Sequence, residues 1–389
     1  MARALPSADL SPADLRQRVA ASGLRGRGGG QFPVGQKWRA VALEEGSRLV
    51  VANGAEGEPG SIKDRYVMTT RASQVLQGLA LAARAVGAAE AIVYLKGSFA
   101  AAAAALQAAR AEWDFGALRF EVRLGEESYI VGEETALLES LEGRRAWPRP
   151  KPPYPAAVGY QGRPTLVQNV ETLSHVPAAI ADPEAFRAAP PTLVSLWGHV
   201  ARPGVYEVRL GTPIARLIEE QGGGAPDGVA LVFPAGPSAA PLTAEKLETP
   251  LDAEALHSAG SGLGTASLLV VGRSSDPLSV LDSLAAFFER ESCGQCPPCT
   301  VGTATLHRIA SAVAAGTVRP KDRSDFGEAA SFMKDHGYCA HCRTAAASVG
   351  ALLARATGPA SPARACRPFD SDSPERRAIE AVAAGFRGA

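Results

Sequence analysis

Through the first half of the chain, short apolar runs alternate with longer segments of helical periodicity. The apolar runs predict buried strands at 47–53, 89–97 and 119–125. The longer segments have the length and spacing of helices, and they lie at 8–22, 69–87 and 98–113. Strands that alternate with helices indicate a wound α/β domain, which we place at residues 1–188.

The pattern changes after residue 188. Residues 189–273 contain short strands, LVSLWGHV and GVYEVRLG, and then a helix, PIARLIEEQGG, an order typical of a small β-grasp domain. Residues 274–356 are helical by pattern. Residues 357–389 form a tail rich in proline and alanine, which we expect to be partly disordered, with Cys366 as an exposed thiol.

Length, charge and cysteine content narrow the class of protein. A chain of 389 residues is too long for one ordinary core. With 40 basic and 40 acidic residues it has no global field that would attract nucleic acid or an anionic membrane. No run of about 18 uncharged apolar residues and no signal peptide is found. We therefore expect a cytoplasmic protein, free or peripheral to a membrane complex, without direct membrane insertion.

The cysteines indicate metal ligation. All six lie at or after Cys293, too few and too one-sided for a disulfide scaffold. Cys293, Cys296 and Cys299 form C-x2-C-x2-C, and Cys339 follows about 40 residues later. Three thiolates at this spacing can hold three corners of an iron-sulfur cubane while a remote cysteine closes the fourth. A structural zinc site remains an alternative, because Cys339 and Cys342 form a second C-x2-C.

A glycine-rich loop at 22–38 offers bare backbone to a ligand through Gly26, Gly28 and Gly29. Lys37 can supply a charge to a phosphate. The loop follows a helix rather than a strand, so it does not match the dinucleotide-binding fingerprint. An ordinary glycine-rich surface loop is the alternative interpretation.

Polar residues at turns supply further candidates. Glu56 and Glu58 follow a predicted strand, where carboxylates could accept ribose or amide donors; a solvated acidic turn is the alternative. The remaining candidates each stand at the start of a predicted helix, where dipole partners and helix caps are the alternatives. They are Glu133, Glu134, Asn169 and Thr172.

Taken together, these segments resemble one known family. GLRGRGG, EPGSIKDR, YIVGEETALLESLEGRR, KPPYPAAVG, NVETLSHVPA, RPGVYEV, AGSGLGT and ESCGQCPPC occur in the order typical of the NADH-binding flavoprotein (F-type) subunit of complex I, the respiratory NADH:quinone oxidoreductase. The diaphorase flavoprotein subunits of soluble NAD-linked hydrogenases and formate dehydrogenases are similar. The resemblance implies a Rossmann-like flavin domain, a β-grasp domain of the soluble-ligand-binding type, and a C-terminal helical bundle that carries an iron-sulfur cluster.

The resemblance also implies three cofactors, FMN, NAD(H) and a [4Fe-4S] cluster. The implied FMN contacts are Gly26, Gly28, Gly29, Lys37, Asn53, Glu133, Asn169 and Thr172. The residues implied to face NADH are Phe32, Glu56, Glu58, Glu134 and Lys151. The implied cluster ligands are Cys293, Cys296, Cys299 and Cys339.

The implied activity is oxidation of NADH by hydride transfer to FMN, followed by passage of single electrons through the cluster to a partner. Hydride transfer needs alignment and exclusion of water, so we expect no catalytic acid, base or nucleophile. The expected partner is another redox subunit, either a [2Fe-2S] protein or a larger iron-sulfur subunit. One alternative is a flavin and iron-sulfur subunit that takes electrons from a protein instead of NADH. The other is a zinc-stabilised assembly module without catalysis.

The chain also departs from the family pattern, as a divergent and shortened member would. Gln31 stands where the family has glycine, and Ala40 stands in a stretch where an aromatic ring is expected. Other departures fall at Arg39, Ala55, Val131, Gln168, His341 and Cys342. Because most of them touch the nucleotide side, we expect FMN binding and the cluster to be retained better than NADH binding.

Overall fold

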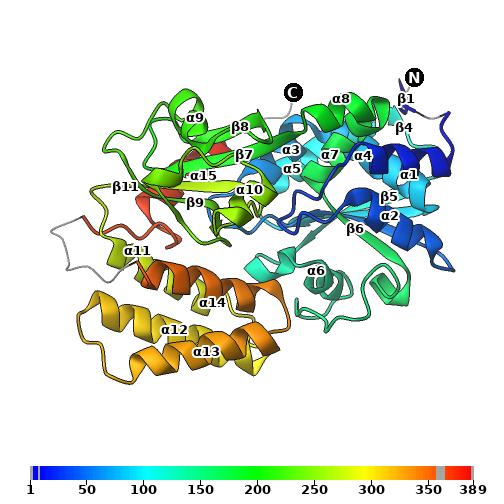
Figure 1. Cartoon of the computed structure of the whole chain (residues 1–389). Coiled ribbons are helices and arrows are strands. Elements are labelled where there is room, and N and C mark those ends of the chain that lie inside the picture. The colour runs from blue at the N-terminus through cyan, green and yellow to red at the C-terminus, as the bar shows by residue number, and fades with distance from the viewer. Residues whose placement is uncertain (1–2, 8, 356–363, 387–389) are drawn as a thin grey trace.

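The structure is a computed structural model that describes residues 3–7, 9–355 and 364–386. Figure 1 shows an α/β domain, a mixed-sheet domain and a helical bundle. The α/β domain is built on a four-stranded parallel sheet in the order β5-β3-β2-β6. Its strands are β2 (Leu49–Gly54), β3 (Glu90–Lys96), β5 (Arg119–Gly125) and β6 (Thr165–Asn169). The predicted wound α/β domain is therefore confirmed.

The two faces of this sheet bury different cores. Successive residues of a strand face opposite sides, so Val50 and Ala52 join the larger core whereas Leu49 and Val51 join a smaller one. Helix α6 (Glu134–Leu141) covers the smaller core. The larger core is covered by α1 (Pro12–Ala21), α2 (Val34–Leu43), α3 (Lys63–Thr70), α4 (Ala72–Val86), α5 (Ala100–Arg110), α7 (Val170–Ala181) and α8 (Pro183–Ala188).

Two helix boundaries differ from the sequence prediction. The predicted helix 69–87 is interrupted at Arg71, which has a non-helical backbone and separates α3 from α4. The predicted helix 8–22 begins at Pro12. Ser11 caps it with a complete capping box, since its side chain accepts from the amide of Asp14 while the Asp14 carboxylate accepts from the amide of Ser11.

The second domain is a five-stranded mixed sheet in the order β10-β9-β11-β7-β8. Strand β11 pairs parallel with β7, and the other pairs are antiparallel. The strands are β7 (Pro191–Gly198), β8 (Gly204–Arg209), β9 (Val229–Pro237), β10 (Leu242–Thr243) and β11 (Ser267–Gly272). The helical segments are α9 (Ile214–Arg216), which continues into a π-helical turn, and α10 (Ala253–Ser258).

The helical bundle carries most of the cysteines. It consists of α11 (Pro277–Arg290), α12 (Pro297–Ala314), α13 (Asp322–His336) and α14 (Ala340–Leu353), drawn in yellow and orange in Figure 1. Its core includes Leu284, Phe288, Leu306 and Met333. Among the described residues, no helix has both the length and the apolar character needed to cross a bilayer.

Of the tail that we expected to be partly disordered, residues 364–386 are ordered, and residues 357–363 and 387–389 lie outside the described residues. Helix α15 (Pro374–Ala384) packs against β7. Phe369 and Ile379 are fully buried in the bundle core. Cys366, expected to be an exposed thiol, is only 4% exposed. The amino-acid composition of the tail did not predict this order, because burial of a few large apolar residues is enough to hold an otherwise polar segment in place.

Tight packing of α4 on α7 generates a stability prediction. A Cβ atom added at Gly78 would lie 1.9 Å from the carbonyl oxygen of Leu173. Replacing Gly78 by Ala should therefore lower the melting temperature, because overpacking costs about 1–3 kcal/mol or more and outweighs the helix propensity gained. Gly327→Ala, in an exposed stretch of α13 with open space around it, should leave the melting temperature equal or higher. Equal shifts for both variants would contradict this account.

Candidate functional site

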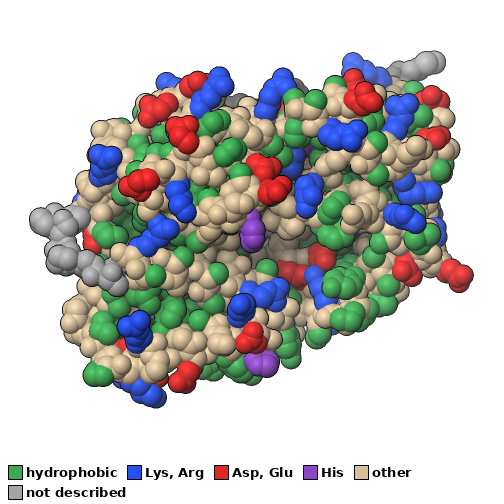
Figure 2. Space-filling view, in the orientation of Figure 1, with side chains coloured by type: hydrophobic (Ala, Val, Ile, Leu, Met, Phe, Trp, Pro, Cys, Tyr) green, Lys and Arg blue, Asp and Glu red, His purple; other side chains and the backbone are tan. Residues whose placement is uncertain are grey.

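The carboxyl ends of parallel strands meet at one edge of the first sheet. Lys96 and Asn169 are the last residues of β3 and β6 there, and Asn53 is the last but one of β2. Ligands of wound α/β domains bind at this edge. Figure 2 shows that the molecule is hollowed between the mixed-sheet domain and the helices α6 and α14, with acidic side chains inside the hollow.

The glycine loop is fastened beside this edge. The amide of Arg27 donates to Thr172 Oγ1 at 2.8 Å, and the amide of Gly26 donates to the carbonyl of Phe32 at 2.9 Å. A Cβ atom at Gly28 would lie 3.1 Å from the Asn169 Cβ atom. Gly29 has φ +107°, a conformation that side-chain-bearing residues rarely adopt. The loop therefore presents bare backbone, with the Phe32 ring 55% exposed at its end.

Asn53 and Asn169 have local structural partners. Asn53 Nδ2 donates to the carbonyl of Gly132 at 2.9 Å and so joins β2 to the start of α6. Asn169 caps α7 by accepting from the amide of Thr172, and its Nδ2 donates to Asp64 Oδ2 at 2.7 Å. The helix-cap interpretation of Asn169 therefore holds. It does not exclude a ligand role, because a cap fixes where the side chain stands.

Four charged residues gather at the start of α6. Lys37 Nζ lies 2.8 Å from Glu134 Oε2. Lys151 Nζ lies 2.8 Å from Glu133 Oε1 and 2.8 Å from Glu134 Oε1. Burial raises the pKa of Glu134, but the two lysines outweigh it and lower that pKa to about 2. The group thus brings together residues predicted for both FMN and NADH, and its two ammonium groups balance its two carboxylates.

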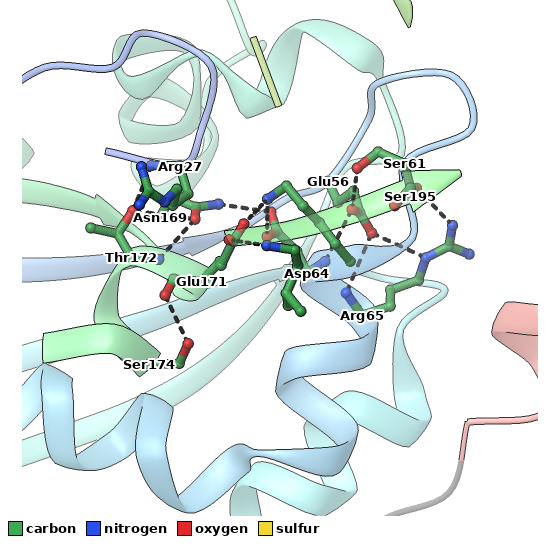
Figure 3. A network of polar contacts seen from close by, with 12 residues as sticks. Arg27, Glu56, Ser61, Asp64, Arg65, Asn169, Glu171, Thr172, Ser174 and Ser195 are labelled. Atoms are coloured by element: carbon green, nitrogen blue, oxygen red, sulfur yellow. Dashed lines mark hydrogen bonds and ion pairs between the residues drawn. The ribbon is translucent and has the colours of Figure 1, made fainter. Parts of the chain in front are cut away.

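A second charged network lies below the glycine loop, shown in Figure 3. Lys63 is 1% exposed and lies 2.7 Å from Asp64 and 2.8 Å from Glu171. Glu171 also accepts from the amide of Leu193 at 2.9 Å, which ties α7 to the second domain. Burial raises the pKa of Asp64, whereas Lys63 holds the pKa of Glu171 low against burial.

Sequence reasoning singled out none of Lys63, Asp64 and Glu171. Lys63 and Asp64 lie in the quoted segment EPGSIKDR, and Glu171 lies in NVETL. The only sign of this network in the sequence was Lys63 followed directly by Asp64. It carried no information on the distance between residues 63 and 171.

The two acids predicted to face NADH differ in their surroundings. Glu56 accepts from Ser61 Oγ at 2.6 Å and from the amides of Asp64 and Arg65 at 3.0 and 3.3 Å, so it caps α3. Glu58 accepts from the Tyr129 hydroxyl at 2.9 Å, and its Oε1 atom is buried without a hydrogen-bond partner. Burial raises the pKa of Glu58 to about 7, although the hydrogen bond from Tyr129 opposes the shift.

The structure shows the conformation or exposure of four residues that depart from the family pattern. Gln31 has φ +49°, in the left-handed region that favours glycine, and its Nε2 donates to the carbonyl of Gly264 at 3.1 Å. The side chain thereby ties the glycine loop to the second domain. Ala40 is exposed on α2, one turn after Lys37, whereas Ala55 is buried behind β2. Arg39 is exposed on another side of α2.

Several buried polar atoms around the glycine loop have no partner among the described residues. These atoms are Gln168 Oε1, Thr265 Oγ1, and Arg27 Nε and Nη1. A buried polar group without a hydrogen bond costs about 1–3 kcal/mol. The region therefore fits a polar ligand that supplies donors and acceptors, as the ring edge and phosphate of FMN would. Arg27 is a further candidate that sequence reasoning missed, because an arginine in a glycine loop is usually exposed.

The cysteines converge from two helix starts. Cys296 precedes the first residue of α12, Cys299 lies in its first turn, and Cys339 precedes the first residue of α14. Helix N-termini favour the thiolate form that binds metals. The carbonyl of Cys293 accepts from Trp147 Nε1 and from Arg145 Nη2, each at 3.1 Å. Cys293 and Cys339 border the core under α6, whereas Cys296 and Cys299 belong to the bundle core.

The cysteine sulfur atoms are spaced more widely than the ligands of a zinc site. Tetrahedral zinc with four thiolates sets its sulfur atoms about 3.8 Å apart. Within the described residues, no three cysteine sulfur atoms lie within 4.8 Å of one another. A cubane binds each thiolate at a different iron atom and so needs a wider set. Cys342, fully buried, donates to the carbonyl of Met333 at 3.4 Å and interacts with the Cys299 thiol.

Comparison with known families gives three matches. A model described as the Nuo51 FMN-binding domain matches residues 19–178. The SLBB domain matches residues 193–238. The NADH-ubiquinone oxidoreductase-F iron-sulfur binding region matches residues 279–356. The matches follow the order of the three parts of the fold.

Individual proteins are similar over most of the chain. The NADH-quinone oxidoreductase F subunit numbered 2 in Rhizobium meliloti is 38% identical over 330 residues, which is 79% of this chain and 78% of the relative. The NADH-quinone oxidoreductase F subunit of Escherichia coli is 36% identical over 356 residues, which is 85% of this chain and 80% of the relative.

Solved structures of an NAD+-reducing [NiFe]-hydrogenase are also similar. A chain of the H2-reduced state is 35% identical, with a TM-score of 0.81, and the match covers 88% of this chain and 61% of the hydrogenase chain. For the air-oxidized state the identity is 32%, the TM-score is 0.82, and the coverages are 98% and 67%. This chain thus spans about two thirds of the length of those chains.

Serine replacements distinguish the possible ligands. Cys339→Ser should abolish bound iron, because it removes a predicted ligand. Cys342→Ser should retain the iron, since a hydroxyl can keep the hydrogen bond to the carbonyl of Met333. The measurement is iron and acid-labile sulfide per chain after anaerobic purification. The reverse result, iron lost with Cys342→Ser and kept with Cys339→Ser, would show that the ligand assignment is wrong.

The raised pKa of Glu58 predicts a pH-dependent stability. As the pH rises from 4.5, the ordinary value for a glutamate, to about 7, the unfolded chain releases this proton while the folded chain keeps it. The free energy of unfolding should fall across this window by up to about 3 kcal/mol. Glu58→Gln stays neutral at every pH. The melting temperature of this variant, relative to that of the wild type, should therefore rise between about pH 5 and about pH 8. The exposed Glu45→Gln is the control. A Glu58→Gln effect that is independent of pH would contradict the shift.

Proposed function

The chain belongs to the family of NADH-quinone oxidoreductase F subunits, and we propose that it performs the family's electron transfer with the residues described above. It is an NADH dehydrogenase type of oxidoreductase subunit that uses FMN, NAD(H) and a [4Fe-4S] cluster. The assignment of residues rests on the closeness of two predicted sites, the charged group at the start of α6 and the cluster cysteines. The core beneath the charged start of α6 is the same core that Cys293 and Cys339 border.

When bound, FMN supplies the conversion of a two-electron donor into single electrons, and the cluster supplies their one-electron carriage. We propose that the glycine loop and Asn169 hold FMN by backbone and amide groups. Lys37 supplies a positive charge to it, and Arg27 offers unpartnered guanidinium atoms to its phosphate or ring edge. Lys63 and Glu171 do not touch the ligand in this proposal, but they fix the position of α7 and hence of Asn169.

For NADH, we propose a site at the open side of the glycine loop. Phe32 offers an exposed ring, and Glu134 and Lys151 offer charged groups at the start of α6. Glu56 contributes by capping α3 rather than through a free carboxylate. The protein aligns the nicotinamide and excludes water, and no side chain has to move a proton during hydride transfer.

A second candidate function is favoured by the nucleotide-side departures. Gln31 spans from the glycine loop to Gly264, and Ala40 offers no ring to an adenine. A chain that binds FMN and the cluster but takes electrons from another protein would have these features. The two functions differ in one observable, the reduction of bound flavin by NADH alone.

The relatives are named as subunits, so other redox subunits are expected to accompany this chain. We propose that a [2Fe-2S] protein or a larger iron-sulfur subunit docks near the bundle. Trp147 is 37% exposed and its indole donates to Cys293, while Tyr338, next to Cys339, is 49% exposed. Exposed aromatic residues are enriched at protein interfaces.

An anaerobic titration tests the proposed function. NADH added to purified holoprotein should bleach the flavin absorption, and the affinity should be about threefold to tenfold weaker than with a stacking ring present. Ala40→Phe should recover this factor, because residue 40 lies one turn from Lys37 on the same side of α2. FMN binding to apoprotein should be unchanged.

Arg39→Phe is the matched control for this repair. Residue 39 is also exposed on α2 but lies two residues from Lys37, on a different side of the helix. Equal gains for both variants would point to general hydrophobicity instead of a stacking position. A flavin that NADH does not bleach in the wild type or in Ala40→Phe would favour the protein-donor function.

A further inference from the structure

A second group of potential ligands lies far along the chain from the cluster cysteines. His199 follows β7, Cys366 precedes α15, and Glu375 lies in its first turn. One donor atom from each lies within 4.8 Å of the other two. Among the described residues, this is the one group of three or more such side chains that meets this distance.

The group lines a cavity of about 280 Å³ whose wall also includes Ser275 and Asp372. His199 Nε2 lies 3.8 Å from Glu375 Oε1, and Cys366 Sγ lies 4.0 Å from the same oxygen. The pair of His199 and Glu375 is too far apart for a hydrogen bond, whereas the Cys366 thiol donates a long hydrogen bond to Glu375 Oε1. Tetrahedral zinc would place such donor atoms about 3.4 to 3.6 Å apart. A contraction of a few tenths of an ångström at these two pairs would therefore suffice.

Ordinary structural roles leave this group unexplained. A glutamate in the first turn of a helix can act as a dipole partner, and a buried cysteine can be simple packing. However, Glu375 Oε2, His199 Nδ1 and Ser275 Oγ are all buried without a hydrogen-bond partner. Ser275 is only 7% exposed. Such unsatisfied atoms around one cavity point to a missing ligand.

We propose that His199, Cys366 and Glu375 bind a zinc-class divalent metal ion that fastens the C-terminal segment to the second domain. Imidazole, thiolate and carboxylate together suit zinc, whereas magnesium and calcium prefer oxygen ligands alone. Binding replaces the thiol proton by the metal, and the proton goes to solvent. The fourth position faces the cavity, which has room for water and is lined by Asp372.

The surrounding structure already holds the ligands in place. The amide of Cys366 donates to Ser279 Oγ at 2.8 Å, and that hydroxyl donates to the carbonyl of Cys366 at 3.0 Å. The amide of Arg364 donates to the carbonyl of Ser274 at 2.8 Å. Helix α15 continues from Glu375 to Glu380, which pairs with Arg65 of α3 at 2.7 Å. A metal here would therefore brace α3, next to the charged network under the glycine loop.

Zinc analysis of the holoprotein tests the proposal. The protein is incubated with zinc chloride, desalted, and assayed for zinc, iron and FMN per chain. The wild type should retain about one zinc per chain. His199→Ala, Cys366→Ser and Glu375→Gln should each retain less than about a tenth. All should keep their iron and FMN. His257→Ala, at an exposed histidine on α10, is the control and should retain zinc.

Wild-type protein without retained zinc, or His199→Ala with undiminished zinc, would overturn the proposal. Zinc gained at the expense of iron and unaffected by His199→Ala would overturn it as well, because that zinc would occupy the cluster cysteines. If the variants lose iron or FMN through misfolding, anomalous scattering at the zinc edge from wild-type crystals decides. A peak between the three side chains supports the site, and a peak elsewhere or none refutes it.

Discussion

The candidate site depends on one buried ion-pair group. Lys63 is almost fully removed from water and lies between the carboxylates of Asp64 and Glu171. A buried charge that loses its partner costs about 3–5 kcal/mol, so these groups can be stable only together. Each carboxylate also binds something else, Asp64 the amide of Asn169 and Glu171 the backbone of Leu193. The start of α3, the start of α7 and the first strand of the second domain are therefore fixed relative to one another.

This arrangement explains how a glycine-rich loop can serve as one wall of the site. The glycine loop has few side chains to pack, and it is positioned mainly through Thr172 on α7 and through Gln31 to the second domain. In the family pattern the position of Gln31 is glycine. Here Gln31 adopts a left-handed backbone conformation, which is unfavourable for a residue with a side chain. In return, its side chain forms a hydrogen bond that joins the glycine loop to the second domain.

Local features were predictable from the sequence and long-range ones were not. The strand at 119–125 was predicted with its observed bounds, because apolar runs and turn residues act over a few positions. The family resemblance supplied the candidate ligands, including the two lysines that meet at Glu134. The pairing of Lys63 with Glu171 and the burial of Cys366 depend on contacts across more than 80 residues. No local pattern encodes such distances.

The ion pair between Arg65 and Glu380 joins residues 315 positions apart, and this separation has a consequence for synthesis on the ribosome. At about 5–20 residues per second, roughly 15 to 60 seconds pass between the appearance of Arg65 and that of its partner. During that interval α3 has emerged without the carboxylate that pairs with Arg65. This ion pair therefore forms late, because it has to wait for the synthesis of α15.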